Sequence, residues 1–486
     1  MKEAILGLGK DTLIYGIGSM VSRFISLLLL PLFTAYLAPA DYGIMAMLAL
    51  LAMVAQPVFG LGMGAAMGPA YFQGNDPNRK SATVWTAFLL LLASSCVLLV
   101  LAWAVPAPLS RLVTRTDEHS LLVSLTLTGT VFGILATPFT MRMQFDRKTR
   151  EFVRITLLGA LLSTALSVVA VAHMGWGVKG MIAAQAVGQA LNFLMFLAAG
   201  ARGTAIAYAK PIGAELLRLG IPLVPGFAFI FILLQGNRYI LQWLEGLDQV
   251  GIYSIGFNIG MVMTIVVGGV TQAWYPFFMS YIDKPEDARR TFGVITYYYV
   301  IIVGGITVLF FILAHPMILL LTKPPFHQAY LVVGFSAMSQ FLVGLFSLLA
   351  PGMYFQKEVR FVSLWQGISA MVSLPLGFIM VTHWGLFGAG LALTVSSTFL
   401  PLSQWLWNQH RKRDYVAIDY PWRRLAIPAL TYLGTAAASL LLVPDRLIWS
   451  ITFSILLCAG LTAFAYWQVR LVGSFPSLLK VEAKAA

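Results

Sequence analysis

An arginine lies deep within the first long apolar segment of the chain. Arg23 is about 11 residues into residues 12–38, roughly 17 Å along a helix. An arginine at the centre of a bilayer costs about 2.5–3.5 kcal/mol to insert. No Asp or Glu lies at comparable depth in any other apolar segment. The favoured interpretation is a cation that binds an anionic substrate, because a guanidinium group suits bidentate contact with phosphate. An internal ion pair is the alternative.

A second arginine, Arg238, lies near the predicted outer end of the apolar segment 216–241. Its guanidinium group has two interpretations. It either binds substrate or extends to the membrane interface, where the charge stays in water.

Uncharged amides also interrupt the apolar segments. Gln185, Gln189 and Asn192 follow i, i+4, i+7 spacing, which places them on one helix face. Gln56 precedes Pro57, and Asn258 lies early in its own segment. Each amide either lines a cavity or hydrogen-bonds a neighbouring helix. The sequence therefore predicts these substrate-binding residues: Arg23, Gln56, Gln185, Gln189, Asn192, Arg238 and Asn258.

The residues that catalysis or metal binding would need are not arranged for it. His173, His315, His327 and His383 fall at predicted outer helix ends or loops, without metal-ligand spacing. No Ser-His-Asp set or pair of carboxylates is suggested at either membrane face. We therefore expect no enzyme activity, no metal site and no cofactor.

The elements that must position these side chains are membrane helices. Hydrophobic residues make up 59% of the 486 residues and charged residues 10%, against about 25% charged in soluble domains. About 14 apolar segments are each long enough for a hydrocarbon core of roughly 30 Å. They are 12–38, 43–66, 82–104, 121–140, 153–173, 178–199, 216–241, 251–273, 291–314, 329–349, 361–382, 385–407, 424–443 and 447–470. The predicted fold is an all-α integral membrane protein.

The net charge of +13 is mostly a topology signal. With a cytosolic N-terminus, roughly 25 Lys and Arg fall on the cytosolic side and about six on the other. This asymmetry places both termini of a multi-pass membrane protein in the cytosol; the resemblance described below implies that the membrane is the bacterial inner membrane. The asymmetry argues against nucleic acid as a partner, and membrane lipids are a secondary one.

Short motifs recur at an offset of about 208 residues, which indicates an internal repeat. Residues 37–44 resemble 244–252, and 176–180 resemble 384–388. Six segments separate the copies, so both enter the membrane in the same sense. The predicted parts are an N-terminal lobe at 1–200, a cytosolic linker at 201–215, a C-terminal lobe at 216–408, and two further helices with a cytosolic tail at 409–486. Chance similarity between apolar segments is the alternative.

Asp41 and Asp248 occupy equivalent places in the two copies, at the predicted outer ends. We expect them to help close the outer side of a cavity between the lobes, through contacts with donors such as helix N-termini. Ordinary capping of the helices that follow is the alternative.

Several stretches resemble bacterial oligosaccharide flippases, which belong to the multidrug, oligosaccharidyl-lipid and polysaccharide exporter superfamily. They are Leu30-Pro31-Leu32-Phe33-Thr34, Ala40-Asp41-Tyr42-Gly43, Gly220-Ile221-Pro222-Leu223-Val224-Pro225, Asn237-Arg238-Tyr239-Ile240-Leu241, Val250-Gly251-Ile252-Tyr253-Ser254 and Gln272-Ala273-Trp274-Tyr275-Pro276-Phe277-Phe278. The resemblance covers most of the first 12 segments at the level of the fold. Many relatives carry Asp before the Arg-Tyr pair, where this chain has Asn237.

The resemblance implies two six-helix lobes around a central cavity that is often cationic. It also implies that an oligosaccharide linked to a polyprenyl pyrophosphate moves from the cytosolic to the periplasmic leaflet by alternating access, for surface polysaccharide (exopolysaccharide) synthesis. The expected partners are lipid-linked oligosaccharide, membrane lipids, and a polysaccharide polymerase or glycosyltransferase. Two alternatives are an accessory export component of a synthase complex and a cation-coupled multidrug exporter. The exporter would require a membrane-embedded carboxylate.

Overall fold

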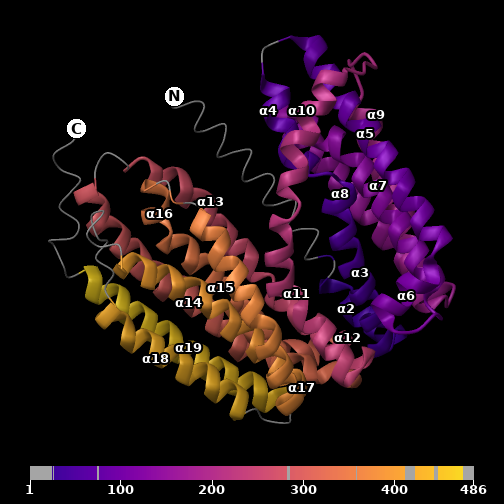
Figure 1. The fold of residues 1–486 in the computed structure, drawn as a ribbon. Coiled ribbons are helices and arrows are strands. Elements are labelled where there is room, and N and C mark those ends of the chain that lie inside the picture. The colour runs from indigo at the N-terminus through magenta and orange to yellow at the C-terminus, as the bar shows by residue number, and fades with distance from the viewer. Residues whose placement is uncertain are drawn as a thin grey trace. The chain divides into compact units, whose positions relative to one another are not determined.

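The computed structural model describes residues 25–473, except 26, 74–75, 282–284, 357, 359, 411–421 and 443–446. Every regular element in these ranges is a helix (Figure 1). This confirms the all-α class. The chain forms two compact units, unit 1 at residues 1–228 and unit 2 at residues 229–486. Arg23, and with it most of the predicted span 12–38, lies outside the described residues.

Unit 1 is built from α-helices that begin at strong start signals. Pro39, Pro77 and Pro106 each occupy the first turn of a helix, where the missing N–H costs nothing. The Asp76 carboxylate caps α5 by accepting from the Asn78 N–H at 2.9 Å. The helices are α2 (Leu30–Tyr36), α3 (Pro39–Phe59), α4 (Met63–Phe72), α5 (Pro77–Ala104), α6 (Pro106–Thr114), α7 (Ser120–Phe145), α8 (Thr149–Val168), α9 (Gly177–Gly200) and α10 (Lys210–Gly220). A π-helical turn, Val169–His173, extends α8.

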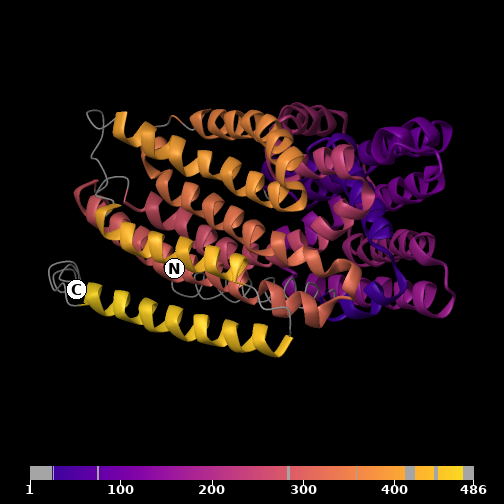
Figure 2. The ribbon, with the colours of Figure 1, turned by 90° about the horizontal axis from the view of Figure 1, so that it is seen from below.

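Unit 2 takes up the rest of the chain. Its helices are α11 (Gly226–Glu245), α12 (Leu247–Gly260), α13 (Met263–Met279), α14 (Pro285–Leu321), α15 (Tyr330–Leu349), α16 (Pro351–Phe355), α17 (Arg360–His410), α18 (Trp422–Leu441) and α19 (Leu447–Gly473). The last two helices lie along α14, as the yellow ribbons of Figure 2 show. Buried hydrogen bonds hold them there: Tyr432 Oη donates to the Ile301 carbonyl at 2.7 Å, and Tyr297 Oη donates to Gln468 Oε1 at 2.8 Å.

Ten helices of the described chain are long and apolar enough to cross a membrane, or up to 12 if each of two bent helix pairs is one span. One of the ten, Phe361–Asn408, has 48 residues. A straight helix of that length measures about 72 Å, more than twice a hydrocarbon core. Gly385 interrupts it with a non-helical backbone, at φ 51° and ψ −127°. The interruption falls where the sequence separates the predicted spans 361–382 and 385–407.

The helix boundaries repeat at the offset seen in the sequence. Helix α12 begins at Leu247, which is 208 residues after α3 begins at Pro39. Gly177 and Gly385, also 208 residues apart, both have positive φ, at 54° and 51°. Equal spacing of helix starts and of a positive-φ glycine supports a duplicated supersecondary unit, since chance similarity of apolar residues would not reproduce backbone geometry.

The predicted linker 201–215 includes the first half of a helix. Helix α10 begins at Lys210, extends beyond the linker to Gly220 and packs on α4 and α5 of unit 1. Its Ile212 and Leu216 are buried. The Ala209 N–H donates to Thr86 Oγ1 at 3.0 Å, and Trp85 Nε1 donates to Thr204 Oγ1 at 3.1 Å. Segment 204–220 therefore packs on the other helices of unit 1 and forms hydrogen bonds with them.

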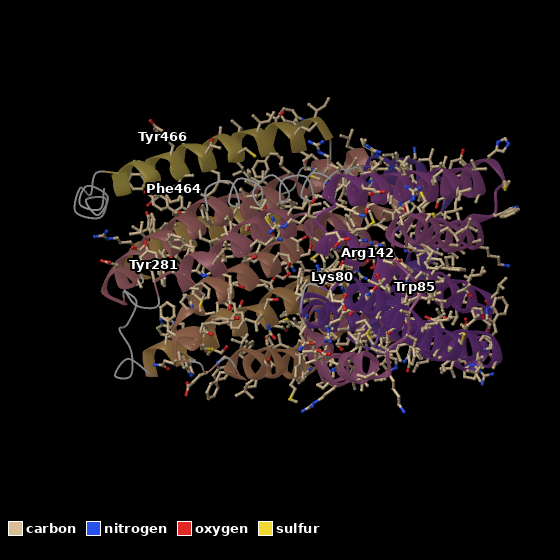
Figure 3. All side chains as sticks on the ribbon, turned by 90° about the horizontal axis from the view of Figure 1, so that it is seen from above. Lys80, Trp85, Arg142, Tyr281, Phe464 and Tyr466 are labelled. Carbon is tan, nitrogen blue, oxygen red and sulfur yellow. The ribbon has the colours of Figure 1, made fainter. Side chains whose placement is uncertain are left out.

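Arg142 of α7 anchors the start of the same segment by donating to the Gly200 and Arg202 carbonyls. Figure 3 labels Arg142 beside Lys80 and Trp85 of α5. Lys80 Nζ lies 5.6 Å from the ring centre of Tyr71, a cation–π contact. Two basic side chains of unit 1, those of Arg142 and Lys80, thus contact other groups of the same unit.

Helix α10 approaches the break between α3 and α4 so closely that only glycine fits. A Cβ added at Gly220 would lie 2.2 Å from the Leu61 carbonyl oxygen. We expect Gly220→Ala to lower stability by about 1–3 kcal/mol, because backbone must move. Gly213→Ala on the same helix is the control, since its Cβ would meet Thr86 Cγ2 at an ordinary 3.4 Å. The Tm of both purified variants tests this, and equal Tm values would contradict it.

Candidate functional site

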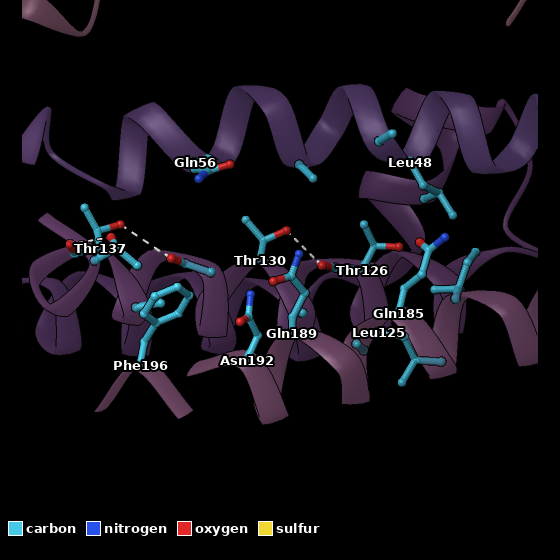
Figure 4. A pocket seen from close by; sticks show the side chains of 18 of the residues that line it. Leu48, Gln56, Leu125, Thr126, Thr130, Thr137, Gln185, Gln189, Asn192 and Phe196 are labelled. Carbon is cyan, nitrogen blue, oxygen red and sulfur yellow. Dashed lines mark hydrogen bonds between the residues drawn. The ribbon is translucent and has the colours of Figure 1, made fainter. Parts of the chain in front are cut away.

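Helices α3, α7 and α9 of unit 1 enclose a cavity of about 550 Å³ (Figure 4). All three helices belong to candidate membrane spans. The polar side chains that line the cavity are uncharged: Gln56, Thr126, Thr130, Thr137, Thr140, Gln185, Gln189 and Asn192. A polar cavity of this size within membrane helices is typical of a binding site.

The predicted amide stripe of α9 faces this cavity. Gln185, Gln189 and Asn192 all line it, as their spacing on one helix face requires. Gln56 lines the cavity from α3, and Figure 4 shows it across from Thr130 and Gln189. Three amides of one helix and a fourth from a distant part of the sequence thus line one cavity.

Small residues of α7 make room for the cavity. Gly129, Gly133 and Ala136 line it, and a Cβ added at Gly129 would meet the Ala186 Cα of α9 at 3.2 Å. The two helices are therefore in close contact beside the opening. Asn192 is held on its far side by α8, because its amide lies against Gly159, whose added Cβ would meet Asn192 Oδ1 at 2.8 Å.

The threonines of α7 were not identified from the sequence. Thr126, Thr130, Thr137 and Thr140 lie at i, i+4, i+11 and i+14, which is one face of a helix. That spacing is a signal, but threonine often bonds its own helix and is then a packing residue. The spacing does not indicate which neighbouring helix this face contacts.

Arg238 is buried in α11 of unit 2, with 5% of its surface exposed. The guanidinium carbon lies 4.7 Å from the ring centre of Phe257 in α12, a cation–π contact. Its Nε is buried without a hydrogen-bond partner, and no carboxylate of the described chain forms a salt bridge with it. The guanidinium group is therefore covered by protein, and the two interpretations of Arg238, substrate binding and extension to the interface, stay predictions.

The neighbouring Asn237 forms a structural hydrogen bond. Its Nδ2 donates to the Ala389 carbonyl of α17 at 3.1 Å, and the side chain is buried. An ionised aspartate could not make this bond, because it has no donor. Asn258 is exposed on α12 in unit 2 and is not among the residues that line the α3–α7–α9 cavity.

The two predicted gate residues lie in the first turns of equivalent helices. The Asp41 carboxylate accepts from the Ala38 N–H at 2.9 Å, which is the reciprocal half of a capping box at the start of α3. Asp248 is exposed in the first turn of α12. Capping is thus observed for Asp41, and a first-turn carboxylate at Asp248 also interacts favourably with the helix dipole.

Two solved structures share the fold across most of the chain. The lipid II flippase MurJ in an inward closed conformation has a TM-score of 0.67 at 15% identity, over 94% of this chain and 99% of that one. A MATE family multidrug resistance transporter of the MOP superfamily, inward-facing, has a TM-score of 0.65 at 13% identity, over 82% and 98%.

A MOP superfamily transporter from Pyrococcus furiosus has a TM-score of 0.57 at 14% identity, over 83% of this chain and 95% of that one. At these identities the likeness concerns the fold. A comparison with curated protein sequences gives no match. Residues 8–282, more than half of the chain, match the model of a family described as "Polysaccharide biosynthesis protein". The chain belongs to the polysaccharide biosynthesis protein family.

Proposed function

We propose that this protein flips an oligosaccharide linked to a polyprenyl pyrophosphate from the cytosolic to the periplasmic leaflet. The observation that carries the proposal is the uncharged polar cavity of unit 1, which lies between membrane helices. Sugars require hydroxyl and amide partners when they leave water. Family membership and the shared fold with a lipid II flippase support the same kind of transport.

The cavity favours a saccharide over a cationic drug. An exporter of cations needs a carboxylate at membrane depth, and no Asp or Glu lines the cavity among the described residues. The shared fold with MATE transporters keeps the exporter as the second candidate. An accessory role in a synthase complex is the third, and it differs because the substrate would carry no lipid.

The proposed architecture is two six-helix lobes, at 1–200 and 216–408, followed by two further helices. The kink at Gly385, the two bent helix pairs and the predicted span at 12–38 together would bring the 10 helices to 14. The 208-residue offset of helix starts supports parallel lobes that alternate access by rocking. Both termini lie in the cytosol of a protein of the inner membrane, beside a polymerase or glycosyltransferase that uses the same lipid.

The substrate's parts have separate proposed partners. The amides Gln56, Gln185, Gln189 and Asn192 bind sugars in the cavity that they line. Arg23 and Arg238 bind the diphosphate, and Asn258 contributes a further amide. The division follows from chemistry, since phosphate requires cations and sugars require neutral donors and acceptors.

Removing two cavity amides tests the function. We expect Gln185→Met with Gln189→Met to reduce flipping by about 5- to 150-fold, because two hydrogen-bonding groups are lost, each worth about 0.5–1.5 kcal/mol. The assay uses purified protein in proteoliposomes with a fluorescent polyprenyl-diphosphate-linked oligosaccharide. Val187→Met on the same helix is the control, since its side chain is 50% exposed and does not line the cavity.

The same assay separates the candidate functions. Wild-type protein alone should flip the lipid-linked unit. If it exports a fluorescent cation instead, the drug-exporter function is correct. If it moves neither and polysaccharide export in cells requires a synthase, the accessory function is correct.

The proposed gate makes a prediction about access. Asp41→Asn with Asp248→Asn should increase periplasmic labelling of a Thr130→Cys reporter, in a protein whose Cys96 and Cys458 are replaced by serine. The reporter position lines the cavity. Unchanged labelling, with a free energy of unfolding lowered by about 1 kcal/mol through lost capping, would assign both carboxylates to capping alone.

A further inference from the structure

The cavity lining has no formal charge on any of the described residues that form it. Gln189 lies near the middle of α9, a candidate membrane span. A charged ligand group at that depth would lose water and meet no counter-charge from this lining. Burial of an unpaired charge is far more costly than burial of a hydroxyl group that finds a hydrogen-bond partner.

Two of the four threonine hydroxyl groups of the lining already donate their protons to the α7 backbone. Thr130 Oγ1 donates to the Thr126 carbonyl at 2.9 Å, and Thr140 Oγ1 donates to the Thr137 carbonyl at 2.8 Å. A hydroxyl has one proton and two lone pairs. These two oxygens therefore offer the cavity lone pairs only.

The amides supply the donors, and they supply as many acceptors. Each of the four side-chain amides has one carbonyl oxygen and one NH₂ group. Adding the threonine oxygens makes the lining rich in acceptors. Such a lining complements groups that can donate.

We propose that this cavity selects saccharides whose sugars are uncharged and rejects those that carry a carboxylate, an inference that rests on the proposed function. A sugar hydroxyl donates to the threonine and amide oxygens and accepts from the amide NH₂ groups. A carboxylate in the same place can only accept hydrogen bonds, and no cation stands beside it among the described residues of the lining. Gln189 and Asn192 set this specificity because they are amides rather than acids or bases.

The experiment compares two polyprenyl-diphosphate-linked disaccharides in proteoliposomes that contain the full-length protein. The lipids differ only at C6 of the terminal sugar, which is CH₂OH in a hexose and a carboxylate in the uronic acid. We expect wild-type protein to flip the neutral lipid at least about tenfold faster, a modest ratio for a buried charge without a partner.

Opposite charges placed at one position control for the disturbance that any substitution causes. Gln189→Arg should shift the neutral-to-acidic ratio toward the uronic acid, and Gln189→Glu should shift it further toward the neutral sugar. Gln185→Arg and Gln185→Glu, one turn away on the same face, repeat the test if a variant at 189 does not elute as a single species. Equal wild-type rates, with a ratio that no variant changes, would overturn the selectivity and leave the lipid-linked substrate in place. Flipping of neither lipid by folded wild-type protein would overturn the proposed function instead.

Discussion

Arg238→Met is expected to abolish flipping while leaving the protein as stable as wild type, or more stable. The guanidinium group is 95% buried, with a ring contact but no salt bridge to a described carboxylate. Removing a charge from water costs several kcal/mol, and a cation–π contact returns about 2 kcal/mol when desolvated. A methionine of similar length avoids that cost, so the Tm should not fall. Transport should be lost because the proposed diphosphate contact is lost.

Two variants separate the role of this charge from its packing. Arg238→Lys keeps the charge but not the planar fork, so partial activity is expected. Arg79→Met removes a cation whose side chain is 33% exposed and which pairs with Glu215 at 3.2 Å, and surface pairs contribute only about 0–1 kcal/mol. It should change neither Tm nor flipping appreciably. A marked fall in Tm for Arg238→Met would make Arg238 a structural residue, and full activity would remove it from the substrate site.

The contrast between predicted and observed surroundings of Arg238 shows what hydropathy can determine. The apolar pattern places a helix here, and the helix exists. Depth along that helix suggested an interface position. The ring that covers the charge belongs to Phe257 of α12, and which residue of a neighbouring helix meets a given position depends on packing that a single sequence does not encode.

The cavity was predictable from the sequence only in part. The stripe Gln185, Gln189 and Asn192 follows from helical periodicity, so its common face could be stated in advance. The contribution of α3 and α7 to the same cavity could not be stated in advance. Gly129 of α7 allows that helix to approach Ala186 of α9, and a glycine in the sequence does not indicate its partner.

Helix α10 was hidden by its composition. Gly200, Gly203 and Pro211 suggested an irregular connection, since both residue types interrupt helices. Pro211 instead lies in the first turn of α10, a position that proline tolerates. The buried Ile212 and Leu216, four residues apart, form the apolar face of a surface helix. An amphipathic pattern this short is easily missed beside membrane segments.

Arg23→Ala should remove surface polysaccharide from cells although the protein still inserts. Arg23 lies outside the described residues, so the prediction depends on its depth, roughly 17 Å into the segment 12–38. Inserting an arginine at this depth costs about 2.5–3.5 kcal/mol. No carboxylate lies at similar depth in another apolar segment to offset that cost. A diphosphate that enters the membrane would supply the missing counter-charge and use the guanidinium fork.

Two substitutions of Arg23 separate its charge from its hydrogen-bonding geometry. Arg23→Lys retains the charge but loses bidentate contact, so an intermediate amount of polysaccharide is expected. Arg150→Ala is the control, because it removes an exposed cation from the first turn of α8 and should leave polysaccharide unchanged. Protein amounts in the membrane fraction are compared by immunoblot. Wild-type polysaccharide in Arg23→Ala cells at equal protein would show that this charge does not bind the substrate, and an internal partner would then be the better explanation.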